Sequence, residues 1–141
     1  MKPGDASWLS HPGAPGVLNI RVEAPKGDAD DAGLPKTVRL ELAVAEDNPW
    51  VEGHFPEQAV LPGVVLLRWA IEAATAQWPI LGAVRSVSNL KFQRPVLPPA
   101  TLTLILELRT SKRPEDAPDH RLTFRYDQDD QACVRGGVRF A

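Results

Sequence analysis

Residues 51–56 read Val-Glu-Gly-His-Phe-Pro, and residues 61–67 read Leu-Pro-Gly-Val-Val-Leu-Leu. The first run places the titratable imidazole of His54 in a turn constrained by glycine and proline. The second run opens a helix, because residues 64–78 contain no proline or glycine and several alanines, and Pro79 stops the pattern. The sequence therefore predicts a histidine-bearing turn beside the N-terminus of a long helix, an arrangement suited to proton transfer.

The predicted helix is apolar nearly all round, so we expect it to be buried. Its polar side chains, Arg68, Glu72 and Thr75, stand at i, i+4 and i+7 and share one stripe. Trp69 and Trp78 are expected in the core or at a dimer contact.

Alternation of apolar and polar residues with period two predicts strands around this helix. A long buried helix followed by an antiparallel sheet is an α+β layout in which the sheet wraps the helix. Ile105 is an exception to its alternation, and the pattern is weaker in the last strand. The six expected strands are 17–22, 37–44, 84–92, 101–109, 121–126 and 131–140.

With 141 residues, 43% of them hydrophobic, the chain is expected to form one domain, 1–141, with residues 1–16 as an irregular lead-in. A net charge of −2 argues against a nucleic-acid partner or a polybasic membrane surface. The sequence has no apolar window of about 18 residues and no signal-peptide core, so we expect a cytoplasmic protein that does not enter the membrane. The lone Cys133 is expected to be a small buried hydrophobe.

Three scattered histidines do not make a metal site, and no phosphate-cradling glycine loop is present. We therefore expect neither a metal nor a cofactor. His11, in a Pro/Gly-rich segment, and His120, at a strand start, are expected on the surface.

This layout, with Gly-His-Phe-Pro at 53–56 and Leu-Pro-Gly-Val at 61–64, resembles the hotdog-fold β-hydroxyacyl-[acyl-carrier-protein] dehydratases of fatty-acid synthesis. Residues 89–98, Asn-Leu-Lys-Phe-Gln-Arg-Pro-Val-Leu-Pro, are similar to that family's strand–turn segment. The variant with Leu-Pro-Gly-Val-Val and Trp69 looks closest to the divergent dehydratase-like proteins of aryl polyene and related pigment clusters. The resemblance covers most of the chain and implies a hotdog fold, an antiparallel sheet of about six strands wrapped around a central helix.

The resemblance implies a catalytic pair, the histidine of the turn and a Glu or Asp fourteen residues later on the helix. His54 matches the first position, but the second is Arg68, whose guanidinium stays charged and cannot act as an acid. Arg68 can bind substrate through its N–H donors, or pair with Glu72 one turn along. Glu72 is also a candidate substitute for the missing acid.

Dehydration of a 3-hydroxyacyl thioester removes the C2 proton and expels the C3 hydroxyl. His54 is the expected base, since an unperturbed imidazole titrates near 6.5. The backbone N–H groups of Gly63 and Val64, at the positive end of the helix dipole, are expected to polarise the thioester carbonyl. Phe55, Val64, Arg68 and Glu72 are the expected substrate contacts.

By resemblance, the substrate is carried on the phosphopantetheine of an acyl carrier protein. The resemblance also implies a substrate tunnel at a dimer interface. In a homodimer, Arg68 would face His54 of the other subunit. In a heterodimer, Arg68 would instead pair with a different, intact dehydratase subunit. Two alternatives stay open: an acyl thioesterase using Glu57 or Glu72 to activate water, and a non-catalytic dehydratase-like partner subunit. Basic side chains expected near the tunnel mouth for the acidic carrier are Lys91, Arg94, Arg109, Lys112 and Arg113.

Overall fold

The computed structural model of the chain describes residues 14–23, 37–48, 60–111 and 119–141. All six expected strands are present in this part of the chain; three have the expected bounds, and the first, fourth and fifth are longer by one or two residues at each end. The helix begins one residue earlier than predicted and ends before Trp78. The elements are β1 (Gly16–Glu23), β2 (Thr37–Val44), α1 (Gly63–Gln77), β3 (Val84–Phe92), β4 (Ala100–Ser111), β5 (Asp119–Gln128) and β6 (Gln131–Phe140).

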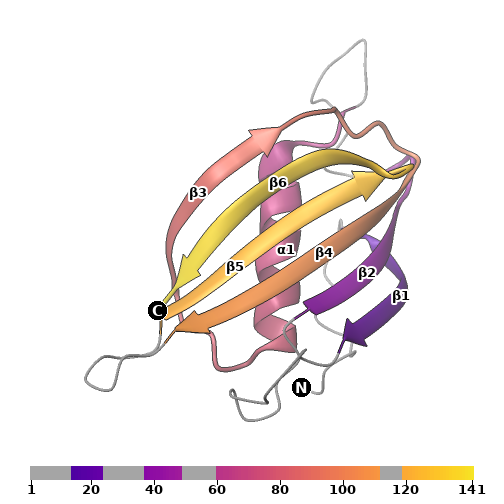
Figure 1. Cartoon of the computed structure of the whole chain (residues 1–141). Helices are drawn as coiled ribbons and strands as arrows, with labels where there is room; N and C mark the ends of the chain where they lie inside the picture. The colour runs from indigo at the N-terminus through magenta and orange to yellow at the C-terminus, as the bar shows by residue number, and fades with distance from the viewer. Residues whose placement is uncertain (1–13, 24–36, 49–59, 112–118) are drawn as a thin grey trace.

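The strands form one antiparallel sheet in the order β1-β2-β4-β5-β6-β3. The chain passes from β2 through α1 to β3 at one edge, and β4 then returns beside β2. Figure 1 shows the curved sheet with β4, β5 and β6 crossing in front of α1. This is the α+β hotdog arrangement that the sequence predicts.

The core lies between the inner face of the sheet and one side of α1. Leu40, Leu104 and Phe124 on the strands are fully buried, as are Trp69 on α1 and Trp78 just after it. Burying a large apolar side chain contributes roughly 1.5–3 kcal/mol to stability, so this face supplies most of the driving force for folding. The prediction that both tryptophans belong to the core is confirmed.

The opposite side of α1 corrects the expectation of a helix buried all round. Val64 is 69% exposed and Arg68 is also exposed, because the sheet covers only one side of the helix. Glu72 and Thr75 continue the same stripe and are partly buried. Among the described residues, no helix has the length and apolar character needed to span a membrane.

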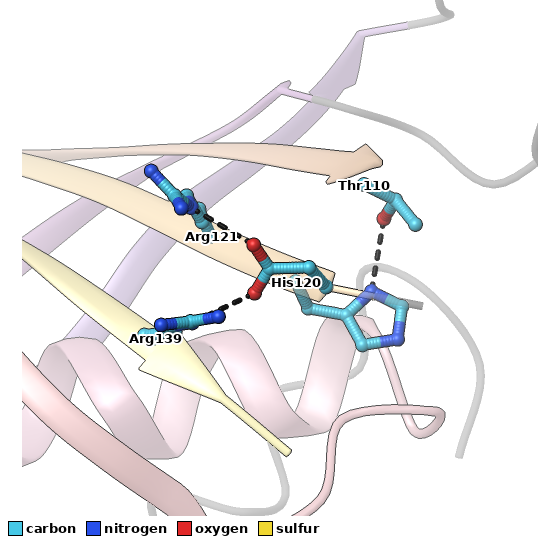
Figure 2. Close-up of polar contacts among 5 residues, drawn as sticks. Thr110, His120, Arg121 and Arg139 are labelled. Atoms are coloured by element: carbon cyan, nitrogen blue, oxygen red, sulfur yellow. Dashed lines mark hydrogen bonds and ion pairs between the residues drawn. The ribbon is translucent and has the colours of Figure 1, made fainter. Parts of the chain in front are cut away.

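The surface position predicted for His120 is wrong. Strand β5 begins at Asp119, so His120 already takes the inward face, where it alternates with the exposed Arg121. Its side chain is buried, and its Nδ1 lies 2.9 Å from the Thr110 hydroxyl oxygen (Figure 2). Cys133 is buried, as predicted, whereas His11 lies outside the described residues.

Candidate active site at the start of the helix

Two segments that contribute to the resemblance, residues 61–64 and 92–96, meet at the N-terminus of α1. The backbone N–H of Leu61 donates to the carbonyl of Val96 over 2.9 Å, which ties the helix entry to the β3–β4 connection. Residues 60–63 and 92–96 then line a mainly apolar cavity of about 440 Å³, together with Leu66 and Val134.

Gly63 begins the helix directly beneath the ring of Phe92. A Cβ atom at position 63 would overlap this ring, with the Phe92 Cζ only 2.6 Å away. Phe92 is 57% exposed, so its ring packs on the glycine and also borders the cavity. Glycine at position 63 therefore lets the Phe92 ring pack closely on the helix start.

The first turn of α1 leaves its positive end uncompensated by local side chains. Pro62 caps the helix with extended backbone and no side-chain hydrogen bond, and the first turn holds no acidic residue. The carbonyl of Pro62 accepts the N–H groups of Val65 and Leu66, over 3.1 and 3.4 Å. The N–H groups of Gly63 and Val64 precede these and, as the first of the helix, have no hydrogen-bond partner within it. A helix end of this kind favours a partial negative charge nearby.

Arg68 forms an ion pair with Glu72 on the exposed side of α1. Its Nε donates to Glu72 Oε1 over 2.7 Å, and the two side chains are 52% and 25% exposed. The Thr75 hydroxyl donates to the Glu72 carbonyl, so the three polar residues form one stripe, as their spacing predicts. Neither Arg68 nor Glu72 lines the cavity at the helix start within this single chain.

Tyr126 on β5 holds the first turn of α1 through a hydrogen bond. Its hydroxyl donates to the carbonyl of Leu66 over 2.6 Å, and Leu66 lines the cavity. Burial, and then the nearby carboxylate of Glu72, raise the pKa of Tyr126 well above its ordinary value, so the hydroxyl stays a donor. The sequence shows only an inward-facing strand residue here, although a buried tyrosine hydroxyl generally requires a hydrogen-bond partner.

Several predicted site residues fall outside the described part of the chain. His54, Phe55 and Glu57 are among them, so the predicted base remains a prediction.

The basic residues expected near the tunnel mouth also lie only partly within the described part of the chain. Lys112 and Arg113 are not described, and only Arg94 lines the cavity. Lys91 and Arg109 lie on the opposite face of the sheet, so they are not at the cavity mouth. The cavity residues Gln93 and Pro95 were not expected, although the Arg-Pro-Val-x-Pro turn that contains Pro95 was the available signal.

Comparison with known proteins agrees with this architecture. The family model described as ApeI-like, ApeI dehydratase, matches residues 31–137. The dehydratase heterocomplex ApeI:P from Xenorhabdus doucetiae superposes with a TM-score of 0.67 at 25% identity, covering 90% of this chain and 97% of that chain. A mutant thioesterase from Pseudomonas aeruginosa shares the fold alone, with a TM-score of 0.54 at 13% identity over 85% of this chain and 79% of that one.

Curated relatives match a shorter region. The 3-hydroxyacyl-[acyl-carrier-protein] dehydratase FabZ of Ruminiclostridium cellulolyticum is 32% identical over 76 residues, which cover 49% of this chain and 54% of that protein. The chain thus spans about half the length of the curated relatives it matches. The family model, by contrast, covers most of the chain and agrees with the fold. This chain therefore belongs to the ApeI-like dehydratases, a hotdog-fold family.

Proposed function

We propose that this chain dehydrates 3-hydroxyacyl groups, held as phosphopantetheine thioesters on an acyl carrier protein, to trans-2-enoyl thioesters. The observation that carries the proposal is the 440 Å³ cavity at the N-terminus of α1, where the uncapped helix end meets the β3–β4 connection. An apolar cavity with a few convergent polar groups suits an acyl chain with one reactive carbonyl. Membership of the ApeI-like dehydratases supports the same reaction.

The chemistry follows from the groups at this helix start. The thioester carbonyl accepts hydrogen bonds from the backbone N–H groups of Gly63 and Val64, which stabilises negative charge on its oxygen. The imidazole of His54 removes the C2 proton, and the C2–H electron pair passes into the enolate whose oxygen these N–H groups stabilise. The enolate then forms the C2=C3 double bond as the C3–O bond breaks, and the departing hydroxyl takes a proton from the imidazolium and leaves as water. This balance requires no oxidant and no cofactor.

The Arg68–Glu72 pair defines how this reaction differs from the standard two-residue scheme. Arg68 occupies the position of the usual acid and is held against Glu72, so it offers N–H donors rather than a transferable proton. The proposal therefore assigns both proton transfers to His54, with Arg68 binding an oxygen of the substrate.

A dimer built on β3 is part of the proposal. β3 is an edge strand of the sheet, and its apolar residues Val84, Val87 and Phe92 are exposed. An edge strand of this length, left unpaired by the described residues, is a template for pairing with another chain. The heterocomplex formed by the relative from Xenorhabdus doucetiae favours a related dehydratase subunit as the partner, and a homodimer is the alternative.

The ion pair also favours a second candidate function, a non-catalytic subunit that supports an intact dehydratase. A guanidinium bound to Glu72 at the acid position is what a chain without proton-donor activity would show.

Mass spectrometry of a 3-hydroxyacyl carrier protein tests these functions together. Wild type should produce loss of water without release of thiol, and His54→Ala should abolish it. Arg68→Glu should retain or increase the loss of water, and Arg109→Gln, on the opposite face of the sheet, is the matched control. Release of free thiol would identify a thioesterase instead. Turnover only with a partner dehydratase, unchanged by His54→Ala, would identify the supporting subunit.

A further inference from the structure

A shallow trough crosses the outer face of the sheet. This face is turned away from α1 and toward the viewer in Figure 1. The strand register sets Thr123, Gly137 and Ser88 in one row across β5, β6 and β3. Because Gly137 has no side chain, the row is lowest at β6. Two adjoining hollows of about 310 Å³ each lie here, and both are lined by Asn89, Thr123 and Gly137.

Basic side chains stand on both sides of this trough. On one side, Lys91 of β3 lies directly opposite Arg135 of β6, and on the other Arg121 of β5 lies opposite Arg139 of β6. Arg135 and Arg139 are four positions apart along β6, which makes the trough about 13 Å wide. Among the described residues that line the two hollows, none is acidic.

The two walls of the trough, the Lys91–Arg135 pair on one side and the Arg121–Arg139 pair on the other, differ in how far acidic side chains offset their positive charge. Asp119 accepts a hydrogen bond from Arg121 over 3.1 Å and from Arg139 over 2.9 Å (Figure 2). Within the described ranges, neither Lys91 nor Arg135 forms an ion pair. Like charges directly opposite each other on neighbouring strands repel, so the Lys91–Arg135 wall is the one that an anion would stabilise.

The edge strand is deformed at the same place. The pairing of β3 with β6 shifts register between Ser88 and Lys91, and Asn89 has a left-handed φ of 54°. Bulges re-aim side chains, and a left-handed non-glycine residue in a strand marks a position held there by its surroundings. Asn89 borders both hollows and adds an amide donor beside Lys91.

We propose that the Lys91–Arg135 end of this trough binds the phosphate group of a small anion. The guanidinium of Arg135 and the ammonium of Lys91 supply the charge, and the Asn89 amide and Thr123 hydroxyl supply further donors over the open floor at Gly137. Arginine suits the paired oxygens of a phosphate, and charge-assisted hydrogen bonds are the stronger class. The site lies across the sheet from the cavity at α1, so it is independent of the proposed dehydration.

Amide NMR spectra of the whole chain, titrated with inorganic phosphate and with adenosine 3′,5′-bisphosphate, test the proposal. Sodium chloride at equal ionic strength is the reference. Saturable shifts centred on the amides of Asn89 and Gly137 are expected with the phosphates and not with chloride. Tighter binding of the bisphosphate would assign an organic phosphate ester, and equal binding would assign free phosphate.

Three charge variants separate this site from general basic surface. Arg135→Gln and Lys91→Gln should each weaken phosphate binding by at least about tenfold, since each removes a charge-assisted contact. Arg121→Gln is the matched control, because Arg121 is already paired with Asp119 on the other side of the trough, and it should change binding by less than about twofold.

Gly137→Val fills the trough without changing charge. A Cβ at position 137 would stand 3.2 Å from the Ser88 hydroxyl oxygen, which can rotate away, and valine favours strands. This variant should fold and lose phosphate binding. Shifts that do not saturate, shifts equal in chloride, or wild-type affinity in Arg135→Gln would overturn the proposal.

Discussion

The inner and outer faces of the sheet use the same strands in different ways. Along β2, the inward Leu40 is fully buried, while its neighbours Arg39 and Glu41 point outward and are exposed. The inner face holds α1 and the cavity at its start, whereas the outer face holds rows of charged side chains. The difference shows that packing and the proposed chemistry depend on one side, so substitutions on the two sides should differ sharply in effect.

Removal of a core side chain on α1 should have the largest effect on stability. Trp69→Ala is expected to lower the free energy of unfolding by about 3–5 kcal/mol, because Trp69 is fully buried between helix and sheet. Urea unfolding followed by circular dichroism measures the change. Arg125→Gln, which breaks the pair with Asp127 on the outer face but keeps most of the aliphatic stem, should cost no more than about 1 kcal/mol. Equal losses for the two variants would remove the distinction between the faces.

The cavity entrance gives the next largest effect. Gly63→Ala should lower the free energy of unfolding by about 1–3 kcal/mol, since the new methyl group overlaps the Phe92 ring. In a Phe92→Ala background the same substitution should cost markedly less, because the ring is gone. A double-mutant cycle in urea gives this coupling, and additive effects would show that the ring does not require glycine here.

The hydrogen bond from β5 to α1 should contribute less. Tyr126→Phe is expected to reduce the free energy of unfolding by about 1 kcal/mol, because it deletes the buried donor to the Leu66 carbonyl. Tyr126→Leu, which also loses ring packing, provides the comparison in the same thermal or urea unfolding experiment. If Tyr126→Phe is as unstable as Tyr126→Leu, the hydroxyl supplies the whole contribution of this side chain and the ring packing supplies none.

The ion pairs of Asp119 on the outer face should make the stability of the protein depend on pH. The hydrogen bond from Arg139 holds the pKa of Asp119 below its ordinary value of 3.8, while partial desolvation opposes this. The stabilising contribution is therefore present above the unfolded-state pKa and is lost as pH falls through the lower folded-state pKa. Asp119→Asn should flatten the fall in melting temperature below about pH 4, relative to wild type. An unchanged acid profile would mean that the two arginines do not stabilise the ionised carboxylate.

The fold was predictable because period-two alternation in most strands matches one buried and one exposed face. Leu102, Leu104 and Leu106 all face inward, as their spacing predicts. Ile105 breaks the pattern yet is buried on the outer face, where the register sets it between Arg39 and Arg125, whose aliphatic stems can cover it. His120 was misplaced because the start of β5 cannot be read from a segment without clear alternation before it.

The candidate site was only partly predictable. The ion pair of Arg68 with Glu72 follows from helix spacing alone, and it is confirmed. The cavity needed two segments about thirty residues apart to be brought together, which the periodicity could not show. The trough depends on cross-strand register and on the bulge at Asn89, neither of which any local sequence pattern specifies.

The proposed dehydration depends most on a base that acts on the acyl α-carbon at the start of α1, with Arg68 in place of an acid. Exchange of the C2 hydrogen of a carrier-bound acyl thioester for solvent deuterium needs the base and the polarised carbonyl, but not the missing acid. Wild type should exchange this hydrogen, and His54→Ala should slow the exchange by about 10²–10⁴-fold. Exchange at the wild-type rate in His54→Ala would contradict the account, because the imidazole would then not be the base.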